Sequence, residues 1–131
     1  MKLQEVIDKF DSYKSFVMAV NKKIIEIVDK NPNFIYAFSQ NCRCSYNGPA
    51  IKDDKIAGPQ CNGCLFGQVL QSMGWLDHQE MNSGSYISTL FYNYSNSNMC
   101  IPDYWRRIQY NQDLGLSWGD SIKEFRKELE E

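Results

Sequence analysis

The N-terminal part of the chain carries a helical pattern of apolar residues. Between residues 3 and 29 apolar side chains recur every three or four positions, which predicts an apolar stripe along a helix. The stripe consists of Leu3, Val6, Ile7, Phe10, Tyr13, Phe16, Val17, Val20, Ile24, Ile27 and Val28. Asp11 and Ser12 can cap a new helix, so the pattern allows either one long helix or two. Pro32 disfavours helical geometry at Asn31, which predicts the end of the helical region.

The next segment has the composition of a strand followed by loops. Residues 34–38 read FIYAF, and such an aromatic and β-branched run favours a short strand. Residues 39–60 are loop-like, and Asn47 followed by Gly48 is typical of a tight turn because this pair accepts positive φ. We therefore expect a small β-hairpin near residues 34–50.

A second helix is predicted over residues 63–72. Phe66, Val69 and Leu70 form its apolar face, and we expect this face to be buried against the first helical region because so short a helix is unstable alone. Gly74 is placed where a helix commonly ends.

Three further helices complete the pattern. One begins near Ser83, and a second follows Asp103, which is placed to cap it, and ends at Gly115. The last starts at residues 117–120, whose sequence SWGD has the form of a capping box. The prediction is one compact, mainly α-helical domain over residues 1–131, with about five helices and the small hairpin.

The charge balance excludes some classes of protein. Fourteen Lys and Arg against sixteen Asp and Glu give a net charge of −2, whereas a dedicated nucleic-acid-binding protein normally carries a basic surplus. No apolar run is long enough for a membrane span, and residues 1–10 lack the apolar core of a signal peptide. We therefore expect a cytoplasmic protein without membrane contact, with reduced cysteines and no disulfide framework.

Four of the five cysteines fall within one short window and raise the question of a metal. Cys42, Cys44, Cys61 and Cys64 form a C-x-C and a C-x-x-C pair, and four thiolates at such spacing can hold zinc. The segment CNGC at 61–64 resembles the second half of a GATA-type zinc finger, in which such a segment opens a helix. The first pair departs from that pattern, and the basic residues used on DNA are missing, so only structural zinc is a candidate. The alternative is that these thiols are packing residues of a protein without a cofactor.

A longer resemblance covers most of the chain. The matching segments are KNPNFIY (30–36), CSYNG (44–48), CLFGQVLQSMG (64–74) and IQYNQDLGLSWGDSI (108–122). With them the chain resembles a family of small proteins encoded by phages and by actinobacterial and other bacterial genomes, most of them without an assigned function. In that pattern the recurring cysteines correspond to Cys44 and Cys64 alone, which favours the packing interpretation over zinc.

The C-terminal third contains the strongest candidate ligand site. Arg106 and Arg107 are consecutive, so both cannot face the core, and their guanidinium groups suit phosphate or carboxylate. Aromatic rings able to stack on a base surround them, at Tyr104, Trp105, Tyr110 and Trp118, with Tyr46 as a further candidate near the hairpin. Gln109, Gln112 and Asp113 add hydrogen-bonding groups. The alternative is an ordinary amphipathic helix with Trp105 and Ile108 inward and both arginines paired with acids of the last helix.

The residues give no indication of catalysis. His78, the only histidine, lies in a polar stretch far from Cys64, so we expect a solvated side chain rather than a partner for a nucleophile. The resemblance implies a non-enzymatic accessory protein of phage or prophage type that counters host defence by binding. Its ligand would be a nucleotide-like, phosphate-bearing small molecule, sequestered in a basic, ring-lined cleft. The alternatives are an inhibitor that binds a host protein through an exposed apolar patch and a zinc-stabilised regulatory domain. The wide stripe on the first helix also allows a homo-oligomer.

Overall fold

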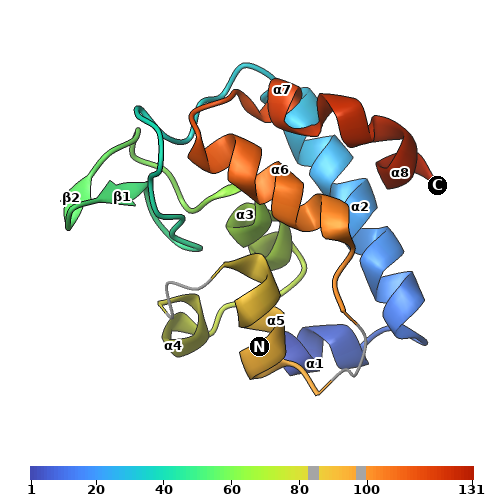
Figure 1. The fold of residues 1–131 in the computed structure, drawn as a ribbon. Helices are drawn as coiled ribbons and strands as arrows, with labels where there is room; N and C mark the ends of the chain where they lie inside the picture. Colours follow the sequence, from blue (N-terminus) through green and yellow to red (C-terminus); the bar gives the residue numbers. More distant parts are fainter. Residues whose placement is uncertain (83–85, 97–99) are drawn as a thin grey trace.

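The first apolar stripe folds as two helices, α1 (Leu3–Asp8) and α2 (Tyr13–Lys30) (Figure 1). The structure is a computed structural model, and it describes residues 1–82, 86–96 and 100–131. Ser12 is the N-cap of α2, and its hydroxyl oxygen accepts the backbone N–H of Ser15 at 3.0 Å. This capping interaction answers the question that the periodicity left open, since it begins a new helix inside the stripe.

Helix α3 (Leu65–Ser72) packs against α2 with its apolar face. The side chains of Phe66, Val69 and Leu70 are all buried, which confirms the predicted face. Gly74 follows the helix with φ +106°, a left-handed conformation that glycine adopts without strain. The predicted end of the helix is therefore confirmed.

Two short helices, α4 and α5, lie below α3 in the view of Figure 1. Helix α4 (His78–Met81) was not predicted, because its segment reads as a polar loop; His78 is exposed, as expected. The buried carboxylate of Glu80 accepts the Leu3 backbone N–H at 2.8 Å and the Trp75 indole N–H at 3.0 Å, which attaches α4 to the N-terminus. Helix α5 spans Ile87–Tyr94, and the start predicted near Ser83 lies outside the described residues.

Helix α6 (Asp103–Asp113) crosses the front of the molecule in Figure 1, between α5 and the C-terminal helices. The C-terminal segment consists of α7 (Trp118–Ile122), the 3-10 turn η1 (Lys123–Phe125) and α8 (Arg126–Glu130), of which α8 packs on α2. The Ser117 hydroxyl accepts the Asp120 N–H at 3.1 Å and so confirms the predicted cap.

The boundaries of α6 were predicted only in part. Gly115 follows it with φ +99°, as expected for a helix end. The expectation that Asp103 caps the helix is wrong, because Pro102 is the N-cap residue and Asp103 is already in the first turn. The Asp103 carboxylate therefore remains available to side chains of the same helix.

A two-stranded antiparallel hairpin projects from the side of the helices (Figure 1). Its strands are β1 (Ile51–Lys52) and β2 (Lys55–Ile56), and the turn between them consists of Asp53 and Asp54, both with positive φ. The hairpin was expected near residues 34–50, and in the structure it follows directly after that range. Residues 34–38 do not join it; Ile35 forms an isolated bridge with Ser117 instead.

The predicted fold class is confirmed, since the structure is mainly helical with one small antiparallel sheet. In the described residues the helices are shorter and more numerous than the expected five, because the first and last helical regions are both divided and α4 was not predicted. Within the described ranges, no helix has the length and apolar character needed to cross a membrane.

Candidate functional site

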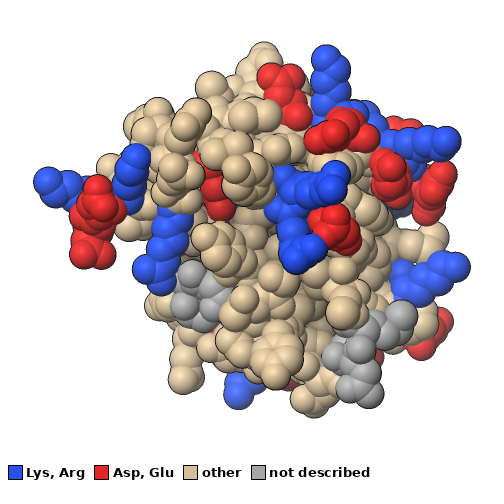
Figure 2. Space-filling view, viewed as in Figure 1, with Lys and Arg blue, Asp and Glu red and all other residues tan. Residues whose placement is uncertain are grey.

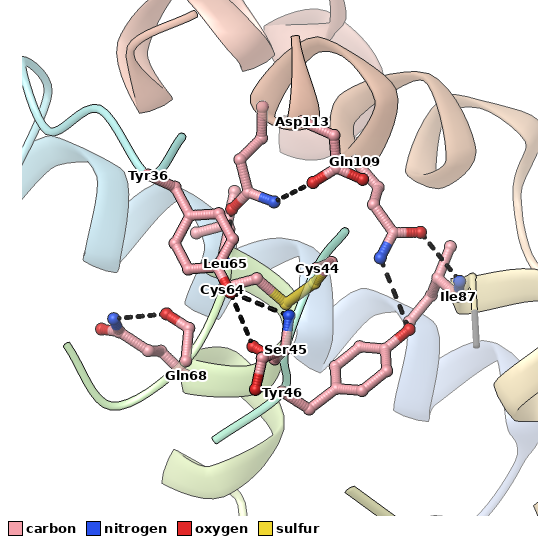
Figure 3. The surroundings of a disulfide bond; sticks show 12 residues. Tyr36, Cys44, Ser45, Tyr46, Cys64, Leu65, Gln68, Ile87, Gln109 and Asp113 are labelled. Atoms are coloured by element: carbon pink, nitrogen blue, oxygen red, sulfur yellow. Dashed lines mark hydrogen bonds between the residues drawn. A yellow bond between two sulfur atoms is a disulfide. The ribbon is translucent and has the colours of Figure 1, made fainter. Parts of the chain in front are cut away.

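Cys44 and Cys64 form a disulfide (Figure 3). Their Cα atoms are 5.9 Å apart, within the usual range for a disulfide. Cys64 is also the N-cap residue of α3, so the bond joins the loop before the hairpin to the start of that helix. The expectation that all five thiols are reduced is wrong for this pair.

The four-cysteine zinc site is not assembled in this structure. The disulfide removes two of the four thiolates, and the other two thiols bind backbone carbonyls: Cys42 donates to Ser39 at 3.1 Å and Cys61 to Gly63 at 3.6 Å. Among the described residues no group of three or more His, Cys, Asp and Glu side chains is arranged to hold a metal ion. Burial also raises the pKa of the Cys61 thiol, which disfavours the thiolate that zinc needs.

Close backbone packing accounts for the spacing of the CNGC segment. Gly63 has φ +141°, and a Cβ atom added there would lie 2.2 Å from the carbonyl oxygen of Tyr46. At Gly67 an added Cβ would lie 2.1 Å from the same oxygen. The glycines therefore let the backbone at Tyr46 pass directly over the start of α3, which is a structural reason for this sequence in the absence of metal.

The two tryptophans that were expected to stack on a ligand belong to the core. The indole of Trp105 is fully buried and donates to Asn21 Oδ1 at 2.8 Å. The indole of Trp118 donates to Gln112 Oε1 at 3.1 Å, and its ring lies 4.5 Å from that of Phe34. Neither ring has a free face for a base, so the structure corrects their assignment as ligand residues.

Gln112 and Gln109 are also buried, and their amides join helices to one another. Gln112 Oε1 accepts the backbone N–H of Leu65 at 2.8 Å, at the start of α3. Gln109 Oε1 accepts the backbone N–H of Ile87 at 2.8 Å, at the start of α5. Both amides position α3 and α5 against α6, and the structure corrects the predicted ligand-reading role of Gln112.

Two of the three predicted tyrosines, Tyr46 and Tyr104, make hydrogen bonds within the protein. Tyr46 is buried, its hydroxyl accepts from Gln109 Nε2 at 3.4 Å, and burial raises its pKa above the ordinary value (Figure 3). Tyr104 is half-buried, accepts from Asn21 Nδ2 at 2.8 Å and stacks on Phe125. Both therefore make contacts that hold the fold together, and neither lines the larger of the two cavities described below.

A cavity of about 550 Å³ lies along the outer side of α6, on the face shown in Figure 2. This volume falls within the roughly 300 to 1,000 Å³ typical of small-molecule sites. The residues around it are Asn41, Cys42, Tyr86, Ser88, Asp103, Arg106, Arg107, Gln109, Tyr110, Asp113 and Leu114. A second cavity, beside Arg43, has only about 160 Å³. The larger cavity is the candidate site, and the predicted ligand residues that line it are Arg106, Arg107, Gln109, Tyr110 and Asp113.

The arginines lie at the rim of this cavity and share one carboxylate. Their side chains are 58% and 66% exposed, and basic side chains gather over α6 in Figure 2. Asp103 forms ion pairs with both Arg106 and Arg107, the latter at 3.2 Å. The hydrogen bond from Arg106 and the neighbouring charges lower the pKa of Asp103, so it stays ionised. The expected partners on the last helix are therefore replaced by an acid of α6 itself, and two cations against one anion leave the rim positive.

Two exposed tyrosines line the same cavity from different helices. Tyr110 is 62% exposed and follows Arg106 by one helical turn on α6. Tyr86 is 73% exposed and is the N-cap residue of α5. The hydrogen bond from Ile87 to Gln109 holds the start of α5 beside α6, and this contact brings Tyr86 to the cavity.

Asp113 is the buried acid of the cavity. It is 7% exposed, and its carboxylate accepts a hydrogen bond from Gln112 Nε2 at 3.0 Å. In the part of the chain that the structure describes, it forms no ion pair. Desolvation raises its pKa to about 7. A carboxyl with a strongly perturbed pKa inside a cleft is typical of a functional site.

Sequence reasoning missed Asn41, Tyr86 and Ser88, which come from the loop before β1 and from the start of α5. Nothing in the linear sequence links these segments to α6. Tyr110 was identified from the sequence as a candidate ring, and its spacing from Arg106 puts both on one side of the helix. No family model, no curated protein and no solved structure matches this chain.

Proposed function

We propose that this protein binds a small, phosphate-bearing, nucleotide-like molecule in the cavity beside α6 and acts by sequestering it, without catalysis. The observation that carries the proposal is the presence of two exposed arginines and two exposed tyrosines around one cavity of suitable volume. A basic, ring-lined cleft is the feature expected of a ligand-sequestering protein.

The arginines supply the anion-binding end. A guanidinium group forms paired hydrogen bonds with phosphate oxygens, and each hydrogen bond to a charged group contributes roughly 1.5 to 3 kcal/mol. In the structure Asp103 accepts from both arginines. A phosphate with more negative charge competes for the same N–H groups, so Asp103 weakens anion binding in this proposal.

The tyrosines supply the stacking end. Tyr86 and Tyr110 expose most of their rings to solvent although both line the cavity. Stacking of a base on an aromatic side chain contributes roughly 1 to 3 kcal/mol. The two rings come from different helices, and the hydrogen bond from Ile87 to Gln109 fixes the start of α5 beside α6.

The biological setting rests on the resemblance alone. The family that the chain resembles consists of small phage and bacterial proteins, and we propose a role of phage or prophage type in the host cytoplasm, where sequestering a nucleotide-like signal counters host defence. Of the described surface features, the cavity favours this role over direct inhibition of a host protein, since it offers both charge and rings at a single site.

Calorimetric titration with 5′-GMP tests the proposal with three variants. Arg106→Ala/Arg107→Ala should weaken binding at least about tenfold, which corresponds to about 1.4 kcal/mol. Asp103→Asn should tighten binding, because it frees both guanidinium groups. Lys14→Ala/Lys22→Ala removes the same charge from the exposed side of α2 and should leave the affinity unchanged.

The melting temperature separates binding from folding in this experiment. Exposed ion pairs contribute roughly 0 to 1 kcal/mol, so the double arginine variant should melt close to the unmodified protein. Equal affinity for the nucleotide in both proteins, or no binding by either, would contradict the proposal.

A further inference from the structure

The cavity beside α6 has two chemically different ends on one helical face. Arg106, Tyr110 and Asp113 follow one another at spacings of four and three residues, so they share a face of α6. At 1.5 Å per residue, Arg106 and Asp113 are separated by about 10 Å along the helix axis. This span is comparable with that of a mononucleotide from its phosphate to the far edge of its base.

The end of the cavity at Asp113 accepts hydrogen bonds. An ionised carboxylate has no donor and can accept about four hydrogen bonds, whereas Gln112 supplies the one described donor to Asp113. The neighbouring amide of Gln109 makes hydrogen bonds within the protein, since its oxygen accepts from Ile87 and its nitrogen donates to Tyr46. A ligand group at this end can therefore donate hydrogen bonds to the carboxylate of Asp113, a residue that is only 7% exposed.

We propose that Asp113 selects the ligand, and that the ligand is a nucleotide whose base presents two adjacent N–H donors, as guanine does. This inference rests on the proposed function, because it assumes that the arginines hold the phosphate. With the phosphate at Arg106, the base lies over Tyr110 and its outer edge reaches Asp113.

The chemistry of the bases makes the selection specific. Guanine carries N1–H and the 2-amino group side by side, so both donate to the two oxygens of one carboxylate. Hypoxanthine keeps N1–H but lacks the amino group, and adenine presents the lone pair of N1 beside its single amino group. Above about pH 7, where Asp113 is ionised, a carboxylate facing that lone pair leaves its own charge unpaired in a buried site, which disfavours adenine.

Because Asp113 is buried, a base that gives its carboxylate no N–H donor binds at a cost, whereas a base that supplies two donors binds favourably. Desolvation raises its pKa to about 7, which indicates that the protein alone solvates this charge poorly. Two N–H groups from a base supply the hydrogen bonds that the described residues do not. The carboxylate of Asp113 therefore gains two charge-assisted hydrogen bonds when such a base binds.

Titration of the protein with three nucleotides at pH 8, where Asp113 is mostly ionised, tests this inference separately from the proposed function. Affinity should fall in the order 5′-GMP, 5′-IMP, 5′-AMP, with at least about a tenfold difference between the first and the last. In Asp113→Asn, which keeps the shape but loses the charge, binding of 5′-GMP should weaken at least about tenfold and the preference should largely disappear.

Each other outcome has a defined meaning. Equal affinity of the unmodified protein for the three nucleotides, or a preference for 5′-AMP, overturns the selection by Asp113 while leaving phosphate binding by the arginines intact. A preference for 5′-GMP that survives in Asp113→Asn overturns it as well. Binding of none of the three nucleotides overturns the proposed function and this inference together.

Discussion

The side-chain oxygen of Gln112 accepts the backbone N–H of Leu65 at 2.8 Å, across 47 positions of the chain. The bond satisfies one of the N–H groups left free at the start of α3. The same oxygen accepts the indole N–H of Trp118 at 3.1 Å. A single buried amide thus joins α3, α6 and α7, and it holds α6 in the position that forms the cavity.

Replacement of Gln112 should therefore destabilise the fold. Gln112→Ala leaves two buried donors, on Leu65 and Trp118, without their acceptor, and each such loss costs roughly 1 to 3 kcal/mol. We expect the free energy of unfolding in urea to fall by at least about 2 kcal/mol. Gln79→Ala, on the exposed side of α4, is the matched control and should change little. Equal stability of the two variants would show that the hydrogen bonds accepted by Gln112 do not stabilise the fold.

The pH dependence of stability should report the buried carboxyl of Asp113. Its pKa is raised to about 7 in the folded protein, against about 3.9 in an unfolded chain. The folded state therefore holds the proton more tightly, and the stabilisation that this group provides is complete below about pH 4 and is lost as the pH rises through 7.

Asp113→Asn makes this prediction measurable. The advantage of the variant over the unmodified protein should grow by up to roughly 4 kcal/mol between pH 4 and pH 8, because only the unmodified protein must bury the charge. Other titratable groups around the cavity are common to both proteins: Cys42, Tyr86, Asp103, Arg106, Arg107 and Tyr110, with Tyr36 and Tyr46 behind Asp113. Asp54→Asn, in the exposed turn of the hairpin, should show no such trend. A constant difference across the pH range would contradict the burial of an ionisable Asp113.

The disulfide should contribute measurably to stability. Cys44 and Cys64 are 20 positions apart, and closing a loop of this size stabilises the fold by about 3 kcal/mol in the chain-entropy account. A reducing agent should lower the melting temperature of the unmodified protein and of Cys100→Ser alike, since Cys100 is a free, exposed thiol.

Metal analysis of the reduced protein separates the disulfide from the zinc alternative. If the four-cysteine site forms on reduction, one equivalent of zinc should raise the melting temperature and a chelator should reverse the effect. That result would favour the zinc hypothesis. Melting that does not respond to zinc, and is lowered by reduction, is the outcome that the disulfide predicts.

Much of the fold followed from local patterns in the sequence. The apolar face of α3, the cap at Ser12 and the helix ends at Gly74 and Gly115 depend on neighbouring residues, so the sequence was sufficient. The position of the hairpin did not follow from local patterns. Residues 34–38 have the composition of a strand, but they form only one bridge, from Ile35 to Ser117. That choice depends on how distant segments pack.

The candidate site was predicted less completely, for the same reason. The sequence identified Arg106 and Arg107 as solvent-facing, since two consecutive residues of a helix cannot both face the core. It could not separate the exposed ring of Tyr110 from the buried ring of Trp105, because both belong to one aromatic cluster. Tyr86 was missed because the contact of α5 with α6 depends on the buried amide of Gln109.

The most direct test of the proposed site is a titration of the isotope-labelled protein with 5′-GMP, followed in ¹H–¹⁵N spectra. We predict saturable shifts of the Nε–H signals of Arg106 and Arg107 and of the backbone signals of Tyr86 and Tyr110. These groups line the cavity from two helices that meet only in the folded protein. Spectra that do not change, or shifts confined to the smaller cavity beside Arg43, would contradict the account.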